Sequence, residues 1–241
     1  MGRAFEYRRA AKEKRWDKMS KLFPKLGKAI TMAAKEGGTD PDMNSTLRSA
    51  IKNAKTQNMP KDNIEAAIKR ADAKDADAYI EMNYEGKGPH GVLVFVECAT
   101  DNPTRTVGNL RPAFSKLGGN LGNSGSVSFQ FTKKGVFKLK FEDVSDPDDL
   151  ELELIDSGLD DMGESVEENG DKVWVLHCEF NDFGNLQQGL EDKGLETISS
   201  EMEWIPQTLV SLDEEQTEEV LKLVDKLEQD EDVQKVFHNL Q

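Results

Sequence analysis

The hydrophobic period of the sequence changes once, at the low-complexity segment ADAKDADA (71–78). Before this segment, apolar residues recur every three or four positions, which is the spacing of one face of a helix. After it, short runs such as YIEMNY (79–84) and VLVFVEC (92–98) alternate or are continuously β-branched and aromatic, as strands are. The chain therefore combines a helical N-terminal part with an α/β remainder, joined by a linker without large apolar residues.

The first 70 residues read as amphipathic helices throughout. A helix over 18–36 carries an apolar stripe and ends at a glycine pair, as C-caps often do. A second helix follows the polar cap segment DPDMNS (40–45), and a third, PKDNIEAAIKRA (60–71), begins with a proline. Short helices of this kind need one another's apolar faces, so we expect a small helical domain over 1–77.

Two α/β blocks follow the linker. Residues 79–131 have a strand–strand–helix–strand order, in which SVSFQF (126–131) is predicted to be the last strand. Residues 136–204 have a strand–helix–strand–strand–helix–strand order with a hairpin turn at Asn169-Gly170, and this is the order of a ferredoxin-like domain. The end of the chain, 206–241, adds the helix and strand that the first block lacks.

The predicted fold class is therefore α+β. A three-helix domain precedes two ferredoxin-like α/β domains, one of which is inserted in the other. The predicted boundaries are 1–77 for the basic helical domain, 78–133 plus 205–241 for the discontinuous α/β domain, and 134–204 for the inserted acidic α/β domain.

Charge is distributed very unevenly along the chain. Residues 1–70 contain 17 Lys and Arg against 8 Asp and Glu, a formal charge of +9, whereas the rest contains 14 against 38, a charge of −24. A basic block beside acidic domains indicates that the N-terminal part binds a polyanion while the rest repels one. The alternative is that the basic residues only form the solvated faces of helices.

Side chains that could contact phosphates fall into three groups: an N-terminal arm, the lysines of the helices, and cations of the helix before a glycine-rich loop. Lysine and arginine contact phosphates regardless of sequence, and each contact adds to the salt dependence of binding. The candidate nucleic-acid-binding residues are Arg3, Arg8, Arg9, Lys12, Lys14, Arg15, Lys18, Lys21, Lys25, Lys28, Lys52, Lys55, Lys61, Arg105 and Arg111, with Lys116 beside them.

The loop SKLGGNLGNSGSV (115–127) holds four glycines and poses a choice between a phosphate cradle and a turn. Phosphate-binding glycine loops precede a helix, whose N-terminal N–H groups bind the anion. Here the glycines follow a helix, where carbonyl oxygens repel phosphate. GNLG and GNSG match the GxxG clamp of KH modules, but that clamp joins two helices. The order favours a helix C-cap followed by a tight turn.

No arrangement of residues indicates catalysis. The residues His90, His177 and His238 are far apart in the sequence, and Cys98 and Cys178 each sit in a strand-like run without a metal-ligand spacing. The acidic clusters DPDD, LDDMGE and LDEEQTEE lack the spacing of a calcium loop, so we expect them to be solvated helix ends. We therefore expect a protein that is not an enzyme and uses no cofactor and no metal.

The start of the chain, MGRAFEYRRAAKEKRWDK, is basic and has no apolar core of a secretory signal. No apolar run approaches the roughly 18 residues that a membrane helix needs. We expect a cytoplasmic protein that does not bind membranes.

Several long segments together resemble the YebC/PmpR family. These are GGTDPDMNSTLRSAIKNAKTQNMPKDNIEAAIKRA, YEGKGPHGVLVFVECATDNPTRTV, FSKLGGNLGNSGSVSFQFTKKG and MEWIP, in this order and at family-like spacing. The resemblance covers almost the whole chain. It departs at the start, where this chain reads GRAFEYRR and the family usually reads Gly-His-Ser-Lys-Trp.

The resemblance implies a three-domain, noncatalytic protein without a cofactor. Members are described as DNA-binding transcriptional regulators, and related proteins act as translation factors on ribosomes. The residues that carry this over are Asn58 to Lys69, the basic positions of the first helices, and Thr100 to Val107. The implied partner is nucleic acid, either DNA or ribosomal RNA. A further alternative is an adaptor whose acidic α/β domains bind a protein.

Overall fold

The computed structural model of the chain describes residues 3–72, 79–167 and 170–241, and the side chains of its first helix from residue 20 onward. The helical part consists of α1 (Arg3–Gly37), α2 (Ser45–Thr56) and α3 (Lys61–Asp72). The helix with the apolar stripe over 18–36 continues back to Arg3, through the basic segment also described as an arm, in keeping with the prediction that the first 70 residues are helical. Ala, Lys, Glu and Arg dominate that segment, and these residues are among the strongest helix formers.

The three helices share a small apolar core. Ile30 and Ala34 of α1 pack with Leu47 of α2 and Ile64 of α3, and all four are buried. Of the two residues in DPDMNS that could cap α2, Asp40 and Asn44, it is Asn44 that accepts the N–H of Leu47, at 3.0 Å.

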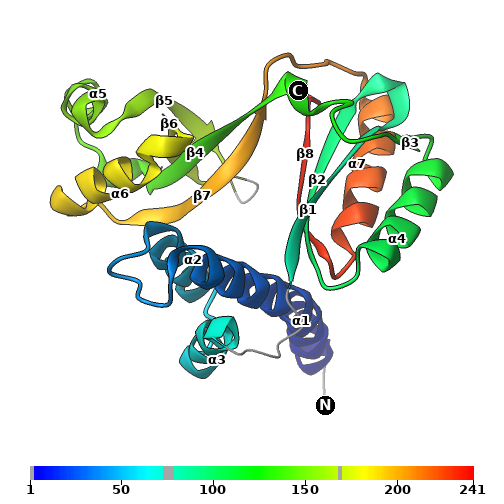
Figure 1. Cartoon of the computed structure of the whole chain (residues 1–241), viewed down its shortest axis with the longest axis horizontal. Helices are drawn as coiled ribbons and strands as arrows, with labels where there is room; N and C mark the ends of the chain where they lie inside the picture. Colours follow the sequence, from blue (N-terminus) through cyan, green and yellow to red (C-terminus); the bar gives the residue numbers. More distant parts are fainter. Residues whose placement is uncertain (1–2, 73–78, 168–169) are drawn as a thin grey trace.

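The first sheet is antiparallel with the strand order β3-β1-β2-β8, and two helices cover one of its faces (Figure 1). Its core includes Val94, Val96, Leu110, Phe114 and Leu223. As predicted, the end of the chain supplies one helix and one strand. The elements are β1 (Ile80–Lys87), η1 (Pro89–Gly91), β2 (Leu93–Thr100), α4 (Pro103–Lys116), β3 (Asn120–Leu121), α7 (Glu214–Glu228) and β8 (Val233–His238).

The prediction of a strand over SVSFQF was wrong. The third strand of this sheet is Asn120–Leu121 inside the glycine-rich loop, and Ser128–Gln130 forms the 3-10 turn η2. The N–H groups of Val127 and Ser128 donate to the carboxylate of Glu85, at 2.6 and 2.9 Å, and are not available to a neighbouring strand.

The second sheet is also antiparallel, with the order β5-β6-β4-β7 and helices α5 and α6 on one face. The predicted strand–helix–strand–strand–helix–strand order is confirmed. LDDMGE was expected at a helix end but lies in β5, where Leu159 and Met162 pack on the core. The elements are β4 (Phe131–Lys140), η3 (Phe141–Asp143), α5 (Pro147–Leu154), η4 (Ile155–Ser157), β5 (Leu159–Val166), β6 (Lys172–Glu179), η5 (Phe180–Asp182), α6 (Phe183–Asp192) and β7 (Thr197–Pro206).

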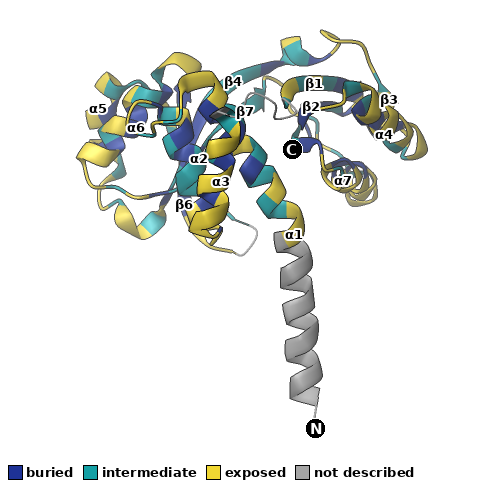
Figure 2. Ribbon diagram, turned by 60° about the horizontal axis from the view of Figure 1, so that its bottom comes forward, coloured by how far each residue is buried: buried dark blue, intermediate teal, exposed yellow. Residues whose placement is uncertain are grey.

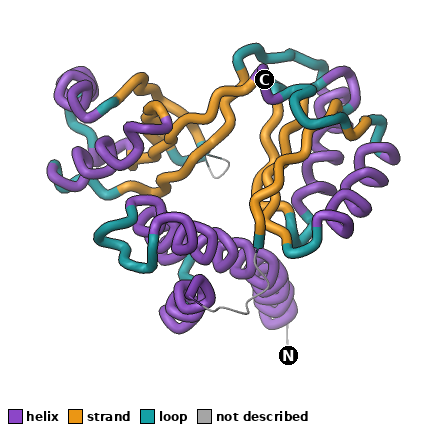
Figure 3. Tube along the Cα trace, viewed as in Figure 1, coloured by secondary structure: helices purple, strands orange, loops and turns teal. Residues whose placement is uncertain are grey.

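Strands β4 and β7 connect the two sheets. At their shared end, the ring of Trp204 lies 4.5 Å from the ring of Phe95, centroid to centroid, and the Trp204 indole donates to Glu97 at 2.7 Å. In Figures 1 and 3 the helical part lies below both sheets and spans from one to the other. The fold class is thus confirmed, whereas the boundaries of the domains stay a prediction.

Candidate nucleic-acid interface

Two lysines of α1, Lys25 and Lys28, contact the end of α7 and the loop that follows it. The ammonium of Lys28 donates to the carbonyl oxygens of Ala99 and Glu231, at 3.1 and 2.8 Å, and to the carboxylate of Asp232 at 3.1 Å. Three acceptors match the three N–H groups of a lysine, and the Lys28 side chain is only 12% exposed. Lys25 donates to the carbonyl of Glu228 at 2.7 Å, and burial lowers its pKa although nearby carboxylates oppose the shift.

Asp232 gathers side chains from three separate parts of the chain. Besides Lys28, its carboxylate accepts Arg105 at 2.8 and 2.9 Å, Thr106 at 2.9 Å and Thr100 at 3.2 Å. We call these five residues, Lys28, Thr100, Arg105, Thr106 and Asp232, the Asp232 hub. Asp232 itself is 2% exposed.

Hydrogen bonds within the hub keep the carboxyl group of Asp232 ionised. Burial favours the neutral acid, but the hydrogen bonds from Arg105, Thr106 and Lys28 outweigh it, so the pKa of Asp232 lies below its ordinary value. Arg105 also donates to Asp101 at 2.7 Å, and its hydrogen bonds with the two carboxylates raise its pKa. Lys28 and Arg105, both predicted to contact phosphate, are thus paired within the molecule.

Other cations of the helical part are open to solvent. Lys55, Lys69 and Arg70 are exposed and Lys52 is half-buried, and among the described residues none of the four has an ion-pair partner. We call Lys52, Lys55, Lys69 and Arg70 the α2–α3 cations. Lys52 and Lys55 are three residues apart on α2 and therefore share one side of the helix.

The remaining predicted residues have various settings. Lys61 pairs with Glu65 at 3.5 Å across one helical turn, and Lys21 is exposed on α1. Arg111 and Lys116 lie exposed on α4, away from the helical part. The side chains of Arg3, Arg8, Arg9, Lys12, Lys14, Arg15 and Lys18 lie outside the described residues.

The glycine-rich loop binds an anion, and that anion is a carboxylate of the same chain. The Glu85 side chain accepts the N–H groups of Gly125, Val127 and Ser128 at 2.6 to 2.9 Å. Burial opposes its ionisation, but these backbone hydrogen bonds prevail and lower the pKa of Glu85. The predicted C-cap is confirmed at Gly118, whose φ is +77°.

The described residues contain no group of three or more His, Cys, Asp or Glu side chains placed to hold a metal ion. Both cysteines are buried as free thiols, and burial raises the pKa of Cys98 and takes that of Cys178 to about 12. In the parts of the chain that the structure describes, no helix combines the length and apolar character of a bilayer span.

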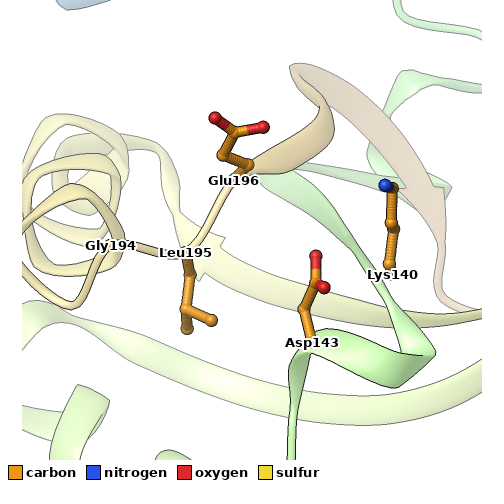
Figure 4. Close-up of a pocket in the computed structure, with 5 residues that line it drawn as sticks. All are labelled: Lys140, Asp143, Gly194, Leu195 and Glu196. Atoms are coloured by element: carbon orange, nitrogen blue, oxygen red, sulfur yellow. The ribbon is translucent and has the colours of Figure 1, made fainter.

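Surface depressions offer little to a small ligand. One is lined by four carboxylates at the start of α7, Asp213, Glu214, Glu215 and Glu218. Figure 4 shows another, in which the charged ends of Lys140, Asp143 and Glu196 lie apart rather than converging on one point. Ligand pockets are mostly apolar with a few convergent polar groups, and neither depression fits that description.

Comparison with known proteins matches both parts of the chain to one family. Residues 3–74 match the description "TACO1/YebC protein N-terminal domain", and residues 79–240 match "TACO1/YebC second and third domain". The chain belongs to the TACO1/YebC family. The resemblance inferred from the sequence is therefore confirmed.

Relatives in the TACO1/YebC family match over their full length. A "probable transcriptional regulatory protein" of Sulfurovum sp. (strain NBC37-1) is 59% identical, and one of Anaeromyxobacter dehalogenans (strain 2CP-C) is 56% identical, with all of both chains covered in each case. The crystal structure of a conserved hypothetical protein from Aquifex aeolicus superposes with a TM-score of 0.81 at 37% identity, covering 92% of this chain and 90% of that one.

Two family segments have clear positions in this TACO1/YebC structure. TDNPTRTV (100–107) supplies Thr100, Arg105 and Thr106 to the Asp232 hub, and its Asn102 caps α4. NMPKDNIEAAIK (58–69) forms the turn before α3 and most of that helix.

The sequence analysis did not predict two carboxylates that decide how the cations and the glycine-rich loop are arranged. Asp232 and Glu85 gave no signal, because a single carboxylate among 46 acidic residues has no distinguishing pattern. Lys69 belongs to the segment Asn58 to Lys69 that carries the resemblance, and Arg70 could have been found beside it, since the two form a basic last turn on α3.

Proposed function

We propose that this protein is a noncatalytic, nucleic-acid-binding regulator of gene expression, and that its helical domain binds the phosphate backbone of DNA to regulate transcription in the cytoplasm. The observation that carries the proposal is the set of α2–α3 cations. In a chain with a formal charge of −15, three of these cations are exposed and Lys52 is half-buried, and none has an ion-pair partner among the described residues. Cations in this state can neutralise phosphates and release counterions.

The names of the relatives also support a role in transcriptional regulation. Proteins that are 59% and 56% identical over their whole length are named probable transcriptional regulatory proteins. At 56 to 59% identity over the whole length, a common role is the simplest proposal.

The acidic α/β domains would restrict where nucleic acid binds, because they repel its phosphates. The outer faces of α5 and α7 are exposed and rich in carboxylates (Figure 2). A polyanion would be repelled from these faces and confined to the helical domain. The same faces suit a basic protein partner, which would bind at a distance from the nucleic acid.

Ribosomal RNA is the second candidate ligand. Three of the four α2–α3 cations are lysines, and an ammonium group contacts phosphate without reading the base sequence. A ligand that is recognised by position and shape, such as ribosomal RNA, suits such contacts as well as promoter DNA does.

Crosslinking in cells tests the proposal. Crosslinked DNA and RNA would be sequenced in parallel, with sedimentation of ribosomes from the same cells. We expect enrichment at promoter DNA, and the Lys52→Gln/Lys55→Gln variant should lose it. Lys87→Gln/Lys226→Gln removes two exposed cations of the α/β part and serves as the matched control. Crosslinks to ribosomal RNA without DNA enrichment would replace the first candidate by the second, and crosslinks to neither would refute both.

A further inference from the structure

Hydrogen bonds join the helical domain to both α/β parts. Towards the first sheet, Lys25 and Lys28 donate to the end of α7 and to the loop before β8. Towards the second sheet, Asn53 exchanges two hydrogen bonds with the backbone of Ser200, at 2.9 and 3.1 Å, and Ser49 bonds Gln187 at 3.2 Å.

The hydrophobic cores show the same separation. The buried cluster of the three helices shares no residue with the clusters of the two sheets. Interfaces within a chain that are polar and lack a shared core allow the domains to move relative to one another. The docked arrangement therefore depends on its hydrogen bonds and ion pairs.

The contact at Lys28 uses the chemistry that binds phosphate. Its ammonium is saturated by three oxygen acceptors, so it cannot bind a phosphate oxygen until it leaves Asp232 and the two carbonyls. Lys25 is likewise held at the end of α7. Both lysines were predicted from the sequence to contact nucleic acid, and in the docked arrangement both are occupied.

The surroundings of the hub disfavour a bound polyanion. Glu228, Asp230 and Glu231 flank Asp232 at the end of α7, beside the side of α1 that carries Lys25 and Lys28. A phosphate backbone on α1 would meet this group of carboxylates as long as α1 stays docked. Undocking removes the repulsion and frees two lysines.

We propose that the Asp232 hub is a releasable latch that regulates the nucleic-acid site. This inference rests on the proposed function. In the closed state the latch holds α1 against the first sheet and occupies Lys25 and Lys28. Nucleic acid binds the open state more tightly, because it gains these lysines and escapes the carboxylates, and so it shifts the population towards that state.

Distance measurement between the two parts tests the latch in the full-length protein. Fluorophores attached at Glu36→Cys on α1 and Ser115→Cys on α4, both exposed positions, report the separation by energy transfer. The native thiols are buried, with raised pKa values, and should resist labelling. The probes are a short DNA duplex and a single-stranded RNA of equal length. We expect the duplex, or the RNA if that is the ligand, to lower the transfer efficiency.

Asp232→Asn weakens the latch while keeping its shape. We expect this variant to populate the open state without ligand and to bind nucleic acid about fivefold more tightly, because the cost of opening is already met. Asp225→Asn is the matched control, since it removes an exposed α7 carboxylate that has no side-chain partner among the described residues. Lys28→Gln opens the latch from the α1 side and leaves Asp232 bonded to Arg105, Thr100 and Thr106, so it covers the case in which Asp232→Asn fails to fold.

The outcomes are distinct. An open, tighter-binding Asp232→Asn with an unchanged Asp225→Asn supports the latch. Equal tightening by both variants would reduce the effect to net charge and overturn the proposal, as would unchanged energy transfer in both Asp232→Asn and Lys28→Gln. If neither probe binds the wild type, the proposed function fails, whereas opening of the two latch variants without ligand still decides whether the latch exists.

Discussion

Lys28 and Lys55 belong to the same helical domain and were predicted from the sequence to do the same thing, yet the structure gives them opposite settings. Lys28 is nearly buried and donates to three oxygen atoms of the first α/β part. Lys55 is exposed and has no ion-pair partner in the described part of the chain. A basic stretch is therefore not one binding surface, because the partner of each cation decides whether it stabilises the fold or remains available to a ligand.

The largest expected loss of stability follows removal of the carboxylate that holds Lys28. Asp232→Ala leaves Lys28 and Arg105 facing each other without their shared carboxylate, and removal of one partner from a buried ionic cluster typically costs about 3 kcal/mol. Urea unfolding should show a loss of this order, with Asp225→Ala unchanged. A loss below about 0.5 kcal/mol would mean that the hub does not stabilise the fold.

The stabilisation by Asp232 should depend on pH, because only its ionised carboxylate binds the two cations. The pKa of Asp232 is lowered in the folded protein, so the unfolded chain takes up its proton first. The stabilisation is present above the ordinary value of 3.8 and is lost as the pH falls through and below it. The difference in unfolding free energy between wild type and Asp232→Asn should therefore be constant near neutral pH and shrink below pH 3.8. A difference that does not change with pH would contradict the assignment.

Other buried carboxyl groups also make the stability depend on pH, so the effect of Asp232 is measured as the difference in unfolding free energy between wild type and Asp232→Asn. Burial raises the pKa of Glu97 and Glu203 near the joint between the sheets. For these groups the folded state binds the proton first, so acidification stabilises the fold as the pH falls through their raised pKa values towards the ordinary 4.5. Their contribution is common to wild type and Asp232→Asn and cancels.

Glu85 extends the comparison to the glycine-rich loop, where an internal carboxylate again occupies a site for an anion. Glu85→Gln keeps the size of the side chain but loses the charge that accepts three N–H groups. We expect a loss of about 1.5 kcal/mol, in the range of hydrogen bonds to charged groups, together with faster hydrogen exchange at Val127 and Ser128. Unchanged exchange there would show that the carboxylate does not hold the loop.

The smallest expected change in stability follows substitution of the two lysines of α2 that have no ion-pair partner among the described residues. Lys52→Gln/Lys55→Gln should change the unfolding free energy by less than about 0.5 kcal/mol, because neither side chain has an ion-pair partner among the described residues. Thermal unfolding in the same buffer as Asp232→Ala gives the direct contrast. A substantial loss would show that these lysines also serve the fold.

Local patterns predicted much of the architecture. The cap at Asn44, the glycine at position 118 and the alternation along 136–204 are read from neighbouring residues, and each of these features is found. The helical segment before residue 18 is local in the same sense, because its alanines, lysines, glutamates and arginines are strong helix formers.

The failures have a different physical origin. SVSFQF alternates like a strand, yet the N–H groups of Val127 and Ser128 donate to Glu85, which lies 42 positions before Val127 in the chain. Lys28 meets Asp232 across 204 positions, and Arg105 meets it across 127. No carboxylate lies within a helical turn of Lys28, and for Arg105 only Asp101, one turn earlier, indicates a partner. A list of basic residues could therefore be compiled from the sequence, but the division of that list into paired and open cations required the fold.

The salt dependence of nucleic-acid binding tests this division most directly. The slope of log K against log salt concentration counts the phosphates that are neutralised, at about 0.7 to 0.9 per contact. The account predicts that Lys52→Gln/Lys55→Gln makes the slope shallower by about 1.5, whereas Arg105→Gln, a change at a cation held by Asp101 and Asp232, leaves it unchanged. A shallower slope for Arg105→Gln together with an unchanged slope for the lysine pair would contradict it.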